Sequence, residues 1–133
     1  MIKNASSLKD NARNVAEKVQ AVSERKLTNS RMKDYYDLYF FVHYKWNEID
    51  KEILVEAIIK TFASRNSIIE LKNISETIKS LQENQFLNKL WLNYREKHNY
   101  SKDINFENTI KAIEIIREEI FANEKIKKQV ISI

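Results

Sequence analysis

The 133-residue sequence contains neither glycine nor proline, and this double absence restricts its possible folds more than any motif does. Proteins contain on average about 7% glycine and about 5% proline. A backbone that approaches a phosphate closely needs glycine, so the sequence excludes a P-loop, a dinucleotide-binding fingerprint and a nucleophile elbow. Tight β-hairpins also lose the residue that suits them best. The chain is therefore predicted to be helical.

The composition is that of a folded, globular chain, with 43% apolar and 32% charged residues. The absence of cysteine excludes disulfides, thiolate metal sites and cysteine nucleophiles, and it agrees with a cytoplasmic location. No apolar run approaches the roughly 20 residues of a membrane span, and the N-terminal residues lack the apolar core of a secretion signal. His43 and His98 each lack a second ligand at metal spacing, so no zinc site is predicted.

Apolar residues recur at steps of three and four along most of the chain, which predicts amphipathic helices. We expect an all-α fold, a single helical bundle of about five helices. The polar stretch 26–30 is a predicted turn, residues 64–70 are a predicted break, and the tail 127–133 is either frayed or a strand that pairs elsewhere. The predicted helices span about 7–26, 31–46, 51–64, 75–98 with an interruption near 82–85, and 106–125.

The predicted helix 31–46 is aromatic on nearly every side. A helix that is apolar all round is usually buried all round, so this segment is expected to be the central helix of the bundle. Its tyrosines would also suit stacking on a nucleic-acid base, although burial is the preferred interpretation. The aromatic residues are Tyr35, Tyr36, Tyr39, Phe40, Phe41, Tyr44 and Trp46.

Positive charge is concentrated at the start of the chain. Residues 1–33 contain eight basic and three acidic residues, a net charge of +5, whereas the whole chain has +4. Such an excess can attract phosphate groups. It is equally typical of a solvated helix face, and both interpretations stay open.

Four charged residues, Arg31, Lys33, Asp34 and Asp37, precede the most aromatic part of the chain. Two carboxylates three residues apart on a helix can face the same way and hold Mg²⁺. Alternatively, one of them acts as a general base that a nearby cation such as Lys18 keeps ionised. A purely structural explanation also exists, because acids are favoured in the first turn of a helix and Lys18 could serve only as an ion-pair anchor.

Three stretches, VAEKVQAV (15–22), SRMKDYYDLYFF (30–41) and AIIKTFASR (57–65), resemble the nucleotidyltransferase toxins of the AbiEii/AbiGii type. Two later stretches, LWLNYREK (90–97) and NFENTIKAIEIIREEIF (105–121), are similar to the C-terminal helical region of that family. The resemblance implies a DNA-polymerase-β-like nucleotidyltransferase that acts in abortive infection or a toxin–antitoxin system, with phage defence as its setting. Some members of the family transfer nucleotides to tRNA acceptor ends.

The resemblance also implies roles for individual residues. Lys18 would contact the nucleotide phosphate, and Asp34 would act as a base or as an electrostatic partner in the transfer. Arg31 and Lys33 would be further phosphate contacts, and Asp37 would complete the motif. The supporting residues would be Glu17, in the AEK motif, and Arg65. The implied cofactors are Mg²⁺ and an NTP.

The sequence departs from the family in lacking its glycine turn and its D-x-D carboxylate pair. Those carboxylates lie on an N-terminal sheet domain and are the expected Mg²⁺ ligands. Residues 1–133 are therefore expected to be the C-terminal helical domain, inactive alone, from a truncated gene, a split enzyme or a trimmed chain. The expected partners are the missing half, a cognate antitoxin and tRNA. The alternatives are a non-catalytic helical module that binds RNA or an antitoxin, and a decayed gene product.

Overall fold

A computed structural model describes residues 5–25 and 31–122, with side chains described for residues 10–24 and 31–122. Within these residues all regular structure is helical, which confirms the all-α prediction. The expectation of about five helices is a miscount, because the described residues form seven α-helices. These are α1 (Ala5–Arg25), α2 (Met32–Phe40), α3 (Lys51–Ser64), α4 (Ile68–Lys72), α5 (Ile74–Glu83), α6 (Gln85–Lys97) and α7 (Phe106–Ala122).

The two additional helices come from the middle of the chain. The predicted break at 64–70 contains the start of α4, and the predicted helix 75–98 is divided at Asn84. There the Asn84 side chain accepts a hydrogen bond from the Leu87 amide at 2.8 Å and caps α6. The predicted helix 51–64 has the boundaries of α3, which Asp50 caps by accepting from the Glu52 and Ile53 amides. The predicted turn 26–30 and tail 127–133 lie outside the described residues.

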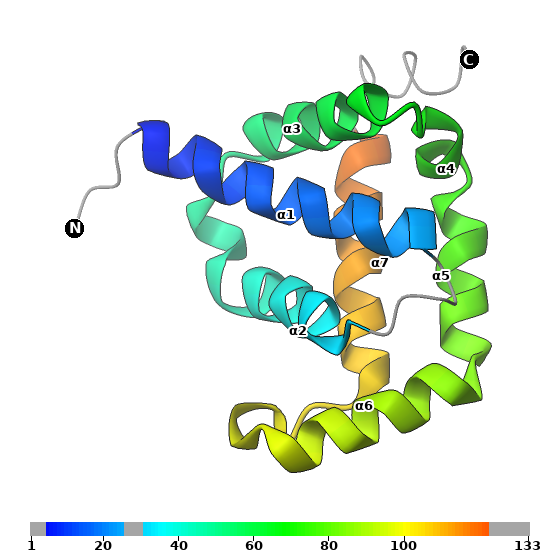
Figure 1. The fold of residues 1–133 in the computed structure, drawn as a ribbon. Helices are drawn as coiled ribbons and strands as arrows, with labels where there is room; N and C mark the ends of the chain where they lie inside the picture. Colours follow the sequence, from blue (N-terminus) through cyan, green and yellow to red (C-terminus); the bar gives the residue numbers. More distant parts are fainter. Residues whose placement is uncertain (1–4, 26–30, 123–133) are drawn as a thin grey trace.

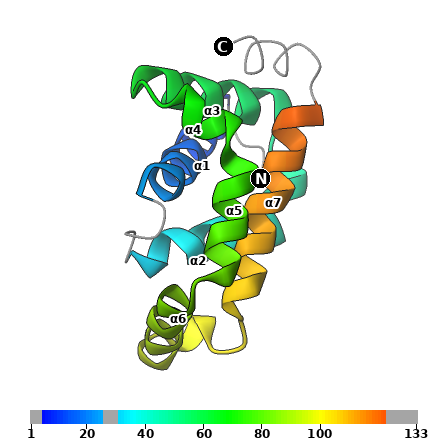
Figure 2. The same cartoon turned by 90° about the vertical axis from the view of Figure 1, so that its right-hand side faces the viewer.

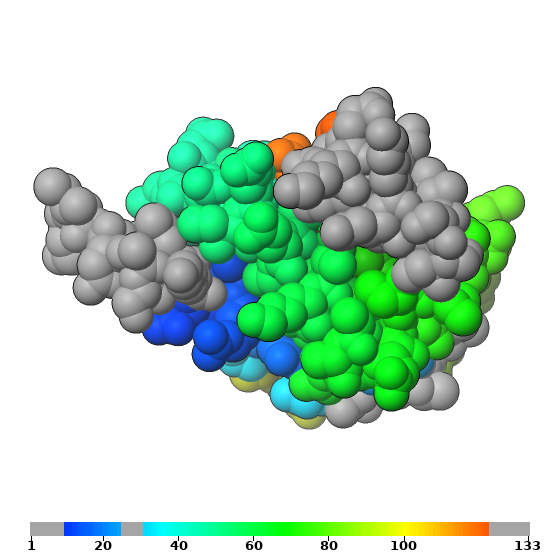
Figure 3. Space-filling view, turned by 90° about the horizontal axis from the view of Figure 1, so that it is seen from above, coloured from blue at the N-terminus to red at the C-terminus, as the bar shows by residue number. Residues whose placement is uncertain are grey.

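Helix α7 lies along one side of the bundle, where it contacts α2, α3 and α5. In Figure 1 it runs behind α1 and α2, and Figure 2 shows it side by side with α5. Helix α1 packs along α3 on one side and α2 on the other. Seen from above, α3 and α4 spread over one end of the molecule with α1 at its edge (Figure 3). One cluster of buried apolar side chains includes residues from all seven α-helices.

The aromatic segment is helical from 32 to 48, but it is not one helix buried on all sides. After α2 it continues as the π-helical segment η2 (Phe41–Lys45) and the 3₁₀ segment η3 (Trp46–Glu48). Tyr35 and Leu38 are fully buried, whereas Phe40 is 39% and Tyr44 60% exposed. The expectation of a central, fully buried aromatic helix is therefore not confirmed. The reason is that the neighbouring helices, chiefly α1 and α7, cover only part of its circumference.

The end of α3 shows how this chain turns without glycine. Asn66 adopts a left-handed backbone conformation with φ 53°. Its amide donates to the Ala63 carbonyl at 3.1 Å, and the Ser67 amide donates to the Phe62 carbonyl at 2.8 Å. These two bonds are the Schellman arrangement, in which glycine usually occupies the position of Asn66. Asparagine is the best substitute because its short polar side chain tolerates that conformation.

None of the helices in the described parts of the chain is both long and apolar enough to cross a bilayer.

Candidate functional site

The charged residues predicted from the sequence meet where α1 packs against α2. Val15, Val19 and Val22 are buried on one face of α1. Lys18 lies three residues after Val15 and so borders that face, with 31% of its side chain exposed. Its Nζ lies 3.2 Å from Oδ2 of Asp37 on α2. Lys18, the cation expected beside the carboxylates, therefore forms an ion pair with Asp37.

Lys33 reaches the same carboxylate from the preceding turn of α2, with its Nζ 3.0 Å from Oδ2 of Asp37. The hydrogen bond to Asp37 and the negative charge of that residue raise the pKa of Lys33. One carboxylate oxygen therefore serves two ammonium groups. Since one negative charge offsets only one of the two positive charges, this lysine pair keeps an excess of positive charge.

Lys18 and Asp37 line a cavity of about 230 Å³ between α1 and the α2–η2 segment. The cavity wall combines polar side chains of α1 with two phenylalanine rings, Phe40 and Phe41. Such a space, with a few polar groups converging on an apolar wall, suits a small ligand or part of a larger one. The lining residues are Asn11, Asn14, Val15, Lys18, Asp37, Phe40, Phe41 and Lys45.

Asp34 occupies a different environment from Asp37. Only 6% of its side chain is exposed, against 22% for Asp37. Its Oδ2 lies 3.8 Å from Nε of Arg31, which is on the outer surface with 64% of its side chain exposed. Of the two carboxylates, Asp37 is thus the one that lines the cavity with Lys18.

The family model described as nucleotidyl transferase AbiEii toxin, type IV TA (toxin–antitoxin) system, matches residues 11–123. The chain belongs to this family. The matched range includes α1 from its second turn, the lysine pair and all of α7. No curated protein and no solved structure matches the chain.

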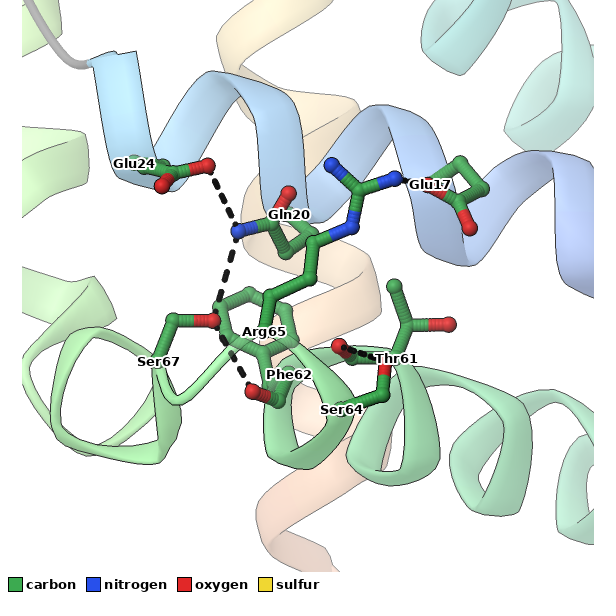
Figure 4. A network of polar contacts seen from close by, with 8 residues as sticks. All are labelled: Glu17, Gln20, Glu24, Thr61, Phe62, Ser64, Arg65 and Ser67. Carbon is green, nitrogen blue, oxygen red and sulfur yellow. Dashed lines mark hydrogen bonds and ion pairs between the residues drawn. The ribbon is translucent and has the colours of Figure 1, made fainter.

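Two further residues that the AbiEii resemblance singled out, Glu17 and Arg65, contact each other. Figure 4 shows this ion pair, which joins α1 to the end of α3. Beside it, Gln20 donates to Glu24 at 2.9 Å and to the Ser67 hydroxyl at 3.3 Å. Glu17 lines a separate groove of about 460 Å³ between α1 and α3. These contacts fix the orientation of α1 against α3, and with it the position of Lys18.

The sequence analysis did not predict every residue that lines the cavity. Asn11, Asn14 and Lys45 line the cavity, although no motif pointed to them. Lys45 lies at the end of the π-helical segment and also pairs with Glu48 at 3.5 Å. A helical wheel with 3.6 residues per turn misplaces the residues after Phe40, because a π-helix has a wider turn. The spacing of Asn11, Asn14 and Lys18 by three and four was the one available signal.

Proposed function

We propose that this AbiEii chain supplies the helical side of a nucleotidyl-transfer site. In the complete enzyme, a nucleotide would pass from an NTP to an RNA such as a tRNA acceptor end. The observation that carries the proposal is the pair of lysines, Lys18 and Lys33, that share the Asp37 carboxylate at the edge of a cavity. A phosphate with several acceptor oxygens can replace or join that shared carboxylate.

Each residue has a distinct part in this proposal. Lys18 binds the phosphate chain of the nucleotide, and Lys33 provides a second cationic contact. Asp37 holds both ammonium groups in place before the nucleotide arrives, so that little reorganisation is needed. The buried Asp34, paired with the exposed Arg31, acts as a base or as an electrostatic partner in the transfer. Glu17 and Arg65 act indirectly, by holding α1.

Mg²⁺ is the metal that this reaction class uses, yet the residues of this chain do not fit a magnesium site. Asp37 is engaged by two lysines and Asp34 by Arg31. Among the described residues there is no group of three or more potential metal ligands. Magnesium ligands would therefore come from a sheet domain outside these 133 residues. We accordingly propose that the chain acts as a C-terminal helical domain and is inactive alone.

Membership of a toxin–antitoxin family implies an antitoxin as a partner. A non-catalytic module that binds RNA is the second candidate function. The exposed rings of Phe40 and Tyr44, next to the lysine pair, favour it.

Calorimetric titration of the chain with Mg²⁺–GTP and Mg²⁺–CTP tests the primary proposal. We expect saturable binding that Lys18→Ala abolishes, because that change removes the ammonium group at the cavity. Lys79→Ala, which removes an exposed lysine from α5, is the matched control and should leave binding unchanged.

Two outcomes would contradict the nucleotide-binding role. One is the absence of nucleotide binding by the unmodified chain. The other is equal binding by Lys18→Ala and Lys79→Ala. Either result would leave the non-catalytic module as the function to pursue.

A further inference from the structure

We propose that an aromatic row along α2 and η2 is a stacking surface for the unpaired bases of a single RNA strand. The aromatic row consists of Tyr100, Tyr36, Phe40 and Tyr44. Lys18 and Lys33 would hold the backbone of that strand. The inference rests on the proposed function for the choice of RNA as the ligand, and it adds where the RNA lies.

The rings of the aromatic row follow one another at short distances. Ring centroids are 4.6 Å apart for Tyr36 and Tyr100, 6.1 Å for Tyr36 and Phe40, and 4.9 Å for Phe40 and Tyr44. Tyr100 comes from η4 (Asn99–Ser101), which follows α6, and α6 contacts α2 (Figure 1). The row is therefore assembled from two distant parts of the sequence.

Three members of the row face solvent. Tyr44 is 60%, Tyr100 53% and Phe40 39% exposed. Large exposed rings that touch one another are unusual, because each could bury apolar area in the core instead. Tyrosine and phenylalanine rings at such a surface offer flat faces on which nucleobases stack.

The π-helical segment helps to create this exposure. Within η2, Phe41 is buried, at 8% exposure, while Tyr44 points outward. A π-helical turn holds more residues than an α-helical turn, so it changes which side chains face the core after Phe40. Such segments occur frequently at functional sites.

Charge favours a nucleic acid over an apolar protein segment as the occupant. Phe40 lines the same cavity as Lys18 and Asp37, so the row adjoins the lysine pair with its excess positive charge. A protein helix in a groove would instead be expected to meet exposed leucine or isoleucine. In the described residues, the exposed Ile69, Leu92 and Ile115 belong to α4, α6 and α7 and not to the row.

The length of the row favours a strand over a single nucleotide. A mononucleotide has one base and one phosphate chain, whereas four successive rings can accept several bases in sequence. Binding proteins for single strands combine such rings with a cationic track for the backbone. The aromatic row and the lysine pair reproduce that combination on one side of α2.

Fluorescence anisotropy of a labelled oligouridylate, titrated with the chain at low salt and without NTP or Mg²⁺, tests the inference. We expect Tyr44→Ala to weaken binding at least about fivefold, the effect of losing one stacked base. Tyr44→Trp should retain binding because it keeps a flat ring. Phe86→Ala on α6, where the ring is 62% exposed, is the matched control and should leave binding unchanged.

An RNA hairpin with the same number of phosphates provides the second arm. Stacking needs unpaired bases, so the hairpin should bind more weakly than the oligouridylate. Equal binding of the two RNAs would overturn the stacking surface, and so would equal effects of Tyr44→Ala and Phe86→Ala or no binding by the unmodified chain. Thermal unfolding of Tyr44→Ala controls for folding, and Phe40→Ala is a second variant in the row.

The nucleotide-binding role and the stacking surface can be contradicted independently of each other. If nucleotide does not bind but the oligouridylate binds in a Tyr44-dependent manner, the stacking surface stands and the nucleotide role is wrong. If Lys18→Ala abolishes nucleotide binding while Tyr44→Ala leaves RNA binding unchanged, the stacking surface is overturned and the nucleotide role stands.

Discussion

The hydroxyl of Tyr35 is buried and has no hydrogen-bond partner among the described residues. Its ring packs against Phe106 of α7, with centroids 5.1 Å apart. An unsatisfied buried hydroxyl costs free energy relative to water. We therefore expect Tyr35→Phe to raise the free energy of unfolding by about 1 kcal/mol in urea denaturation. Tyr44→Phe, at an exposed ring, is the control and should change stability little.

Tyr35→Phe should also change how the free energy of unfolding depends on pH. Burial, followed by the charge of Asp34, raises the pKa of Tyr35 above its ordinary value of 10.0. The fold therefore favours the neutral phenol, and this contribution is complete below pH 10.0 and is lost as the pH rises above it. Above pH 10.0, the unmodified chain should lose about 1.4 kcal/mol more per pH unit than Tyr35→Phe. Parallel stability curves for the two proteins would show that Tyr35 is not the group responsible.

Asp34 and Asp37 differ in their contacts because packing places them in different environments. Both are aspartates in the first two turns of the same helix, and the sequence gives no reason to separate their chemistry beyond the AbiEii motif. Packing buries Asp34 and leaves Asp37 at the cavity with two lysines. The assignment of Lys18 and Asp34 to catalysis stays a prediction, which the nucleotide titration addresses for Lys18.

Because the chain has no glycine, the left-handed position at the end of α3 is filled by Asn66, and its substitution should change the stability of the fold. Asn66 has φ 53°, a conformation that costs residues with a Cβ atom free energy unless the side chain compensates. Asn66→Ala should lower the free energy of unfolding by about 1 kcal/mol in urea denaturation. Asn66→Gly is the control and should be at least as stable as the unmodified chain. A loss of stability in both variants would mean that the amide group of Asn66 matters more than its backbone angle.

The α2–η2–η3 segment shows the limit of sequence reasoning about elements. A helix over 31–46 was predicted, and the structure has helical residues from 32 to 48. The apolar pattern of the sequence does not reveal the change from α to π geometry at Phe41. Aromatic residues surround this helix on nearly every side, so a change in the helical period does not alter the pattern. That change decides which rings are buried and which form the aromatic row.

In the assembled bundle, helix α7 joins several helices that are far apart in the sequence. It contacts α2, α3 and α5, and Ile116 on it is fully buried. Ile116→Ala should lower the free energy of unfolding by about 2–5 kcal/mol, through lost burial and the cavity left behind. The adjacent Ile115, at 39% exposure, is the matched control, and Ile115→Ala should have a much smaller effect. Similar losses in both variants, measured by urea denaturation, would contradict a stabilising role for the buried face of α7.

Four features could be predicted from the sequence without the structure: the all-helical class, the boundaries of α3, the interruption near Asn84 and the AbiEii family resemblance. It could do so because helix caps, apolar periodicity and short motifs are local properties that neighbouring residues encode. It also predicted Lys18 as a partner of the acids of α2, because a lysine that borders an apolar stripe costs free energy unless it is paired.

Three other features could be seen only in the folded chain: which carboxylate Lys18 contacts, how the helices pack around α2, and which aromatic rings remain exposed. These depend on how α1, α2 and α7 pack, and packing depends on residues far apart in the sequence. Tyr100 joins Tyr36 although 64 residues separate them, and Glu17 joins Arg65 across 48 residues. Burial and pairing at such distances are set by the shared core, and no local pattern records them.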